Sequence, residues 1–354
     1  MEEATRDDCL ATSRSTPSNW NYRNWATFLV VLSCWVLPQH AIANEQLTVV
    51  ASIKPIHSIV SAIMEGVGEP HLVMKGAASP HTFILRPSDA RALHNADIVF
   101  QVGETMEQSL ADIIWTIAEK AEIVSLATSK DLVTYSHRVG GVFGTHADHG
   151  HGVDSHGHGK DEHHDETSHE DEEPILHDEI DREMDMHIWL DPANGKVIAR
   201  TIEKVLSESD PDNASTYASN LNSYLEQLNQ LENDIQNQLA DISDTSFLVF
   251  HDAYQYFERR FGLNVAGSVQ EVAGSSLSAK RIRDLQAMIV DQNVKCVFTE
   301  PQFDADVVNT IMGIVELHVD ELDPLGADLE DGPALYPALL RQMTNSFAQC
   351  LTPT

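Results

Sequence analysis

Apolar runs of strand length alternate with amphipathic stretches along most of the chain. Residues 47–53 (LTVVASI) are such a run, and residues 56–66 then place apolar side chains at helical spacing and end on a glycine. The alternation returns later, where 247–250 is an apolar run and 253–261 has helical spacing. A repeated strand–helix order builds a parallel sheet covered by helices on both faces. The pattern therefore predicts an α/β protein with two such halves.

Each half has enough elements for a sheet of its own. Strands are expected at 47–53, 71–74, 97–102 and 122–126 in the first half, and at 247–250, 264–269, 296–299 and 316–322 in the second. Helices are expected at 56–66, 86–96, 107–120 and 193–207, and then at 253–261, 278–292, 304–314 and 333–350.

One long helix is predicted between the halves. Residues 213–241 repeat apolar side chains every three or four positions, and a helix of about 30 residues would span roughly 45 Å. A coiled-coil dimer is the alternative for this stripe. We predict two parallel-sheet α/β lobes, at 44–211 and 243–354, joined by a linking helix at 212–242.

The N-terminus has the pattern of a secretory signal. An apolar run at 26–37 precedes Ala41-Ile42-Ala43, a small-x-small cleavage site, so residues 1–43 are expected to be removed. The run is too short to span a bilayer, which takes roughly 20 residues. A membrane anchor and lipoprotein processing at Cys34 are the alternatives. The mature protein is expected outside the cytoplasm, without stable membrane insertion.

The net charge narrows the classes of partner. The formal charge is −33 and the pI about 4.7, which argues against nucleic acid and anionic membranes and favours cations. Much of this charge lies in one low-complexity tract, residues 146–174 (HADHGHGVDSHGHGKDEHHDETSHEDEEP).

The tract cannot bury a core. We expect it to lie in a disordered His/Asp/Glu-rich insert at about 137–185 in the first lobe. Its irregular spacing offers many partial ligand sets and no single rigid one, so weak, exchangeable zinc sites are expected. A solvated loop without function is the alternative. The auxiliary ligands would be His146, His149, His151, His156, His158, His163, His164 and His169.

Signal cleavage leaves two cysteines, Cys296 and Cys350. In an exported chain they most simply form one disulfide. Two buried free thiols are the alternative.

Three histidines and one carboxylate stand out by position. His81 lies in a turn after a strand, His187 precedes Ile188-Trp189-Leu190, and His251 directly follows the strand at 247–250. Asp323 follows the strand at 316–322. Open α/β sheets bind ligands at the carboxyl ends of strands, and three imidazoles with a carboxylate suit tetrahedral Zn²⁺. The spacing alone does not bring these residues together, because they are far apart in the chain.

A set of ordered motifs resembles the metal-binding class of solute-binding proteins, the zinc-binding periplasmic components of bacterial ABC importers. The matching pieces cover nearly all of residues 47–351. They are Ala51-Ser52-Ile53-Lys54-Pro55-Ile56-His57, Leu85-Arg86-Pro87-Ser88-Asp89, Met186-His187-Ile188-Trp189-Leu190-Asp191-Pro192, Val249-Phe250-His251-Asp252-Ala253, Cys296-Val297-Phe298-Thr299-Glu300-Pro301 and Leu322-Asp323-Pro324-Leu325-Gly326.

The resemblance implies a rigid linking helix and a metal site in the cleft between the lobes. It implies His81 and His187 as ligands from the first lobe and His251 from the second, with Asp323 or water in the fourth place. It also implies the disulfide, a periplasmic monomer in a Gram-negative bacterium, and delivery of Zn²⁺ to an ABC permease without catalysis. Manganese members carry Glu where this chain has His251, which favours zinc. We further expect Asp252 and backbone carbonyls near His187 to support the ligands.

Other functions remain open at this point. The metal could be Mn²⁺ or Ni²⁺, or the chain could be a zinc-dependent hydrolase with Glu300 and Asp323 near the metal. A plain metal buffer that works through the tract alone is a further alternative.

Overall fold

The computed structural model describes residues 46–138, 143, 184–270, 277–303, 308, 310–311 and 317–352. They belong to a compact unit that begins at Gln46. The predicted signal segment, 1–43, lies outside the described residues, as does the histidine-rich tract, 146–174. The ends of the insert predicted to be disordered at about 137–185 are described, and Met184 and Asp185 are buried, so ordered structure extends further into that insert than predicted. None of the described helices is both long enough and apolar enough to cross a membrane.

The first lobe is built on a parallel sheet with strand order β2-β1-β3-β4. Its strands are β1 (Val49–Ala51), β2 (His71–Leu72), β3 (Ile98–Gln101) and β4 (Glu122–Ser125). Its helices are α1 (Lys54–Ile63), α2 (Pro87–His94) and α3 (Gln108–Ile117), with a 3₁₀ turn η1 at Leu126–Thr128. The strand β2 is shorter than predicted because the chain bends after Leu72, although the backbone N–H of Val73 still donates to the carbonyl of Ala51 at 3.1 Å.

The second lobe repeats this topology, with strand order β6-β5-β7-β8 and all pairs parallel. Its strands are β5 (Phe247–Val249), β6 (Val265–Ser268), β7 (Cys296–Thr299) and β8 (His318–Glu321). Its helices are α7 (Gln255–Phe261), α8 (Ala279–Asp291) and α10 (Leu335–Leu351). The helix predicted at 304–314 falls mostly outside the described residues. In the first sheet the chain adds β2 on one side of β1 and β3 on the other, and in the second sheet β6 and β7 flank β5 in the same way. Such switch points are where open α/β sheets bind ligands.

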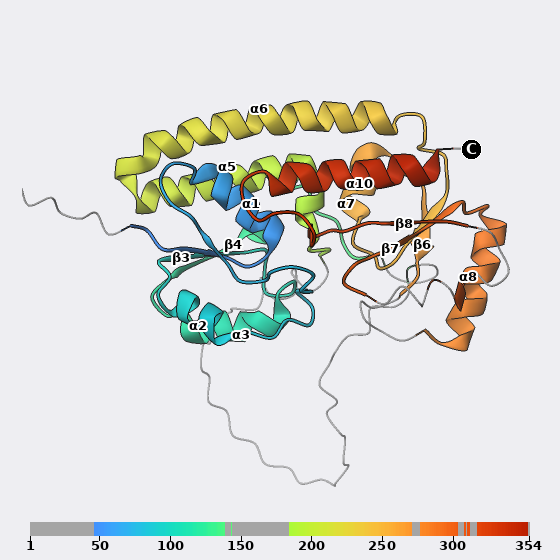
Figure 1. The fold of residues 1–354 in the computed structure, drawn as a ribbon, viewed down its shortest axis with the longest axis horizontal. Coiled ribbons are helices and arrows are strands. Elements are labelled where there is room, and N and C mark those ends of the chain that lie inside the picture. Colours follow the sequence, from blue (N-terminus) through green and yellow to red (C-terminus); the bar gives the residue numbers. More distant parts are fainter. Residues whose placement is uncertain are drawn as a thin grey trace, which may run out of the picture. The chain divides into compact units, whose positions relative to one another are not determined.

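The long helix α6 (Ala214–Leu239) connects the lobes, and α5 (Pro192–Ser209) of the first lobe leads into it through a 3₁₀ turn η3 (Pro211–Asn213) (Figure 1). α6 is the predicted long helix. The apolar stripe of α6 packs against α5 and α10 of the same chain. A stripe buried in this way is part of the core and leaves no seam for a coiled coil through the same residues. The two-lobed α/β fold with a long joining helix is therefore confirmed.

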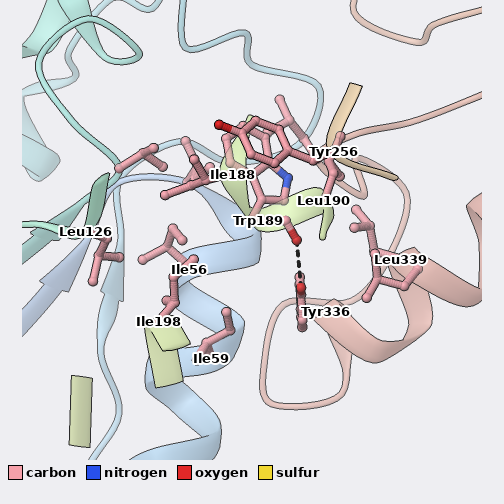
Figure 2. Packing of buried hydrophobic residues seen from close by; sticks show 14 of the residues in the cluster. Ile56, Ile59, Leu126, Ile188, Trp189, Leu190, Ile198, Tyr256, Tyr336 and Leu339 are labelled. Carbon is pink, nitrogen blue, oxygen red and sulfur yellow. Dashed lines mark hydrogen bonds between the residues drawn. The ribbon is translucent and has the colours of Figure 1, made fainter. Parts of the chain in front are cut away.

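A continuous hydrophobic core runs from the first lobe into the second. Alternate residues of β5 serve opposite faces, so Phe247 and Val249 enter this core while Leu248 enters a smaller one beneath α8. Figure 2 shows the packing around Trp189, whose backbone carbonyl accepts a hydrogen bond from the hydroxyl of Tyr336 at 2.6 Å. The predicted Cys296–Cys350 disulfide is present and ties β7 to α10.

Candidate metal centre

Three loops bring the three predicted histidines into one place. His81 lies in a turn between β2 and α2, in which the N–H of Thr82 donates to the carbonyl of Ser79 at 3.2 Å. His187 precedes the 3₁₀ turn η2 (Ile188–Leu190), and His251 follows β5 at its carboxyl end. Two of the histidines therefore come from the first lobe and one from the second.

The three side chains converge closely enough to share one ion. One ligand nitrogen from each ring lies within 4.8 Å of the others, and the ring centroids of His187 and His251 are 5.4 Å apart. The ring of His81 lies 5.9 Å from that of His187 and 6.1 Å from that of His251. Tetrahedral Zn²⁺ with ligands at about 2.0–2.1 Å needs nitrogens roughly 3.3 Å apart, so a small closure suffices. Within the part of the chain that the structure describes, no other group of His, Cys, Asp or Glu meets this criterion.

A buried carboxylate orients His187. The Nδ1 atom of His187 lies 2.8 Å from Oδ1 of Asp185, which also accepts from the backbone N–H of His187 at 3.0 Å. Burial by itself would raise the pKa of Asp185, but the interaction with His187 outweighs it and lowers the pKa, so Asp185 stays ionised. Because Nδ1 is engaged, the Nε2 atom of His187 is the nitrogen left for a ligand.

His251 is held in the same way from the second lobe. Its Nδ1 atom lies 2.7 Å from Oε1 of Glu300, which follows β7, the strand next to β5. Burial opposes a charge on His251, but the Glu300 carboxylate outweighs it, and the pKa of His251 is raised. Its Nε2 atom is buried and has no hydrogen-bond partner among the described residues. A buried nitrogen without a partner is costly, and a bound cation would satisfy it.

His81 is the most accessible of the three. Its pKa is lowered to about 3, first because the surrounding residues partly shield its ring from water and then because the rings of His187 and His251 lie beside it. A metal needs the neutral form of imidazole, so His81 is ready to bind without losing a proton.

The hydrogen-bond partners of the His187 and His251 rings differ from those predicted. Asp252 was predicted, together with backbone carbonyls near His187, to support the ligands. Its carboxylate binds Arg138, with Nε of Arg138 3.0 Å from each carboxylate oxygen, and acts on His251 only as a nearby charge. Asp185 and Glu300 hold the imidazoles. Adjacent residues after a strand point in different directions, so Asp252 is near His251 in sequence but turns to another partner.

The pocket around the histidines is small and has apolar walls. Pro80, Trp189, Phe303, Pro324 and Leu325 contribute to its lining. Its volume is about 10 Å³, which is room for one ion or water molecule.

Asp323 is buried beside this pocket but is not part of the three-histidine group. Its Oδ1 atom accepts from the N–H of Leu325 at 3.0 Å and from Nε2 of Gln302 at 2.8 Å, and its Oδ2 atom accepts from the N–H of Ala327. Each carboxylate oxygen has two lone pairs, so these bonds use both lone pairs of Oδ1 and leave one on Oδ2 for a metal. Its place as fourth ligand stays a prediction. The eight auxiliary histidines of the tract, His146 to His169, lie outside the described residues.

Two parallel-sheet lobes with histidines converging from both define the metal-binding class of solute-binding proteins that the motifs resemble. The family model described as zinc-uptake complex component A, periplasmic, matches residues 49–350. The high-affinity zinc uptake system protein ZnuA of Brucella suis biovar 1 is 44% identical over 314 residues, which cover 88% of this chain and 94% of that protein. The chain therefore belongs to the zinc-uptake complex component A family.

Solved structures share the fold. A crystal structure of ZnuA has a TM-score of 0.67 at 23% identity and covers 87% of this chain and 100% of its own. The solute-binding protein FpvC from Pseudomonas aeruginosa, solved in complex with Mn²⁺, has a TM-score of 0.67 at 19% identity, covering 87% of this chain and 99% of its own. The family consists of transport components, so the prediction that the chain is not an enzyme is confirmed.

Proposed function

We propose that this protein captures Zn²⁺ in the periplasm and delivers it to the permease of an ABC-type zinc importer. The observation that carries the proposal is the convergence of three imidazoles from two lobes, of which His187 and His251 are each held by a buried carboxylate. Carboxylate–imidazole pairs of this kind fix the tautomer of a metal ligand and raise its basicity.

The donor set favours zinc over harder ions. Three imidazoles suit Zn²⁺, whereas Mn²⁺ prefers carboxylate, carbonyl and water oxygens. The nearby Asp323 carboxylate, buried in the loop that also supplies Pro324 and Leu325, or a water molecule would complete a tetrahedral set. The names of the relatives point to the same metal, although FpvC was solved with manganese.

A hydrolase is a poor fit to this geometry. Glu300, the residue that could have served as general base, is committed to Nδ1 of His251 at 2.7 Å. The pocket has room for one ion or water molecule only. A released cargo ion, rather than a resident catalytic metal, is the chemistry that remains.

The proposal also assigns roles to the N-terminal segment, to the two lobes and to the histidine-rich tract. Residues 1–43 would direct export to the periplasm of a Gram-negative bacterium, and the mature chain would act as a monomer with lobes at 44–211 and 243–354. The tract at 146–174 would gather additional zinc in weaker sites and buffer it for the three histidines.

A competition titration tests the proposal. Mature protein, residues 44–354, is titrated with Zn²⁺ against a chromophoric chelator, beside a variant lacking 146–174 and a variant with His81, His187 and His251 all changed to Ala. One tight site should survive the tract deletion and disappear in the triple variant. His94→Ala, which alters an exposed histidine at the end of α2, is the matched control. Tight binding that survives the triple substitution contradicts the assignment.

Growth distinguishes transport from buffering. A strain lacking its own zinc-uptake binding protein should grow in chelated medium when it expresses this protein with its permease. Rescue by the triple variant would mean that the cleft is not the transport site.

A further inference from the structure

A short segment crosses from the first lobe to the second close to the metal site. At its start, the N–H of Val133 donates to Oδ1 of Asn194 in α5 at 2.9 Å, and Nδ2 of Asn194 donates to the carbonyl of Val133 at 2.8 Å. A few residues later, the N–H of Tyr135 donates to the hydroxyl of Tyr256 in α7 at 3.2 Å. Residues 133–138, here called the crossing segment, thus bind a helix of each lobe.

The chain that leads into His187 lies against the crossing segment. Ser136 pairs with Met184 in an antiparallel bridge, and the N–H of Asp185 donates to the carbonyl of Tyr135 at 2.9 Å. Nε2 of Gln255 in α7 donates to Oδ2 of Asp185 at 3.1 Å, while the other oxygen of that carboxylate holds His187. The carboxylate that orients His187 of the first lobe is therefore itself bound by a helix of the second lobe.

Arg138 links the crossing segment to the second lobe through ion pairs. Its guanidinium is mostly buried and pairs with both oxygens of Asp252, while its Nη1 donates to Oε2 of Glu258 at 2.7 Å. Both carboxylates are buried, and Asp252 is the residue next to His251. A planar guanidinium that binds two carboxylates fixes their direction as well as their charge.

We propose that Arg138 is a positioning residue for zinc capture, resting on the function proposed above. By holding Asp252 from the crossing segment, it sets His251 of the second lobe against His187 of the first, so that their free nitrogens stay within reach of one ion. Metal affinity depends on this spacing, because ligands that must first be ordered bind more weakly.

A second interlobe ion pair provides a matched control. Arg260 of α7 binds Asp191 of the first lobe through Nε at 2.7 Å and Nη2 at 2.6 Å. This pair also crosses between the lobes in a bidentate geometry, but neither residue adjoins one of the three histidines. A merely structural role for Arg138 therefore predicts equal effects from breaking either pair.

The experiment compares R138Q, R138K and R260Q in mature protein that retains residues 44–354. Zinc affinity is measured by chelator competition, the absorption spectrum of bound Co²⁺ reports ligand geometry, and thermal unfolding of the metal-free proteins reports stability. We expect R138Q to weaken zinc binding about tenfold and to change the Co²⁺ spectrum, because supports outside the ligand shell typically contribute 10–100-fold. R138K, which keeps the charge and loses the planar fork, should fall between R138Q and wild type.

The control and a double variant decide the interpretation. R260Q should lower thermal stability but change zinc affinity less than about twofold, because it leaves the supports of the imidazoles intact. R138Q combined with D252N should bind zinc no more weakly than R138Q alone, since Arg138 acts through Asp252. Equal losses of affinity in R138Q and R260Q, or an R138Q variant with wild-type affinity and spectrum, overturn the proposal. If R138Q does not fold, the same comparison between R138K and R260Q decides it.

A wrong proposed function would give a different result from a wrong role for Arg138. In that case the wild-type protein itself would lack a tight site that depends on His81, His187 and His251, whatever Arg138 does.

Discussion

Replacing Glu300 by Gln tests how the protein tunes its zinc site. The Glu300 carboxylate lies 2.7 Å from Nδ1 of His251 in a fully buried setting, and it is the main reason that the pKa of His251 is raised despite burial. Gln keeps an acceptor of similar shape but removes the charge. Losing a support outside the ligand shell typically weakens metal binding 10–100-fold, and the retained acceptor places E300Q near the lower end, about tenfold or 1.4 kcal/mol.

The pH dependence has a definite sign. Because the pKa of His251 is raised, the metal-free wild-type protein keeps a proton there to higher pH than an ordinary histidine would, and zinc must displace it. In E300Q burial lowers the pKa of His251 with less opposition, so proton competition begins at lower pH. The affinity ratio of wild type to E300Q should therefore be largest near pH 8 and shrink as the pH falls towards 6.

Chelator competition at pH 8, 7 and 6 measures this ratio. Glu321→Gln at the end of β8 is the matched control, because it removes an exposed carboxylate in the same lobe outside the pocket. An E300Q variant that binds zinc as tightly as wild type at pH 8, or an affinity ratio that grows on acidification, would show that Glu300 does not tune His251.

Three further changes have definite expected outcomes. Changing Cys296 and Cys350 to Ala should lower the free energy of unfolding by about 4 kcal/mol in urea titrations, since their sequence separation is 54; a loss below 1 kcal/mol would contradict the chain-entropy estimate. Gly195→Ala should lower the free energy of unfolding by about 2 kcal/mol in thermal unfolding, because the new Cβ would lie 2.2 Å from the Tyr336 hydroxyl. A more stable variant, as is usual for Gly→Ala in a helix, would show that this contact relaxes freely. Asp185→Asn should weaken zinc binding about tenfold with little change in the order of metal preference, and an unchanged dissociation constant would mean that the imidazole it holds needs no support.

Much of the fold follows from the hydrophobic pattern. Strands and helices alternate in sequence, and parallel sheets require such crossovers, so the two lobes and the joining helix could be predicted. The element ends were less certain. The strand predicted at 71–74 ends at Leu72, and the long helix begins at Ala214 after a 3₁₀ turn at Pro211–Asn213, because local turns decide where an element stops.

The supports of the candidate ligands could not be predicted to the same degree. Glu300 approaches His251 because β7 and β5 are neighbours in the sheet, and strand order is not contained in local sequence patterns. The role of Asp185 could have been predicted from the sequence, since it lies two residues before His187 and its carboxylate can reach that ring. The partner of Asp252 could not be foreseen, because Arg138 is more than a hundred residues away in the sequence.

X-ray absorption at the zinc edge measures whether His81, His187 and His251 bind the ion together. Mature full-length protein, tract included, is loaded with one equivalent of Zn²⁺. We predict a four-coordinate ion with three imidazole nitrogens at about 2.0–2.1 Å and one further light ligand. The same spectrum should persist when 146–174 is deleted and should be lost when His81, His187 and His251 are changed to Ala. A spectrum that survives the triple substitution, or an ion with fewer than three imidazoles in the wild type, would contradict the claim.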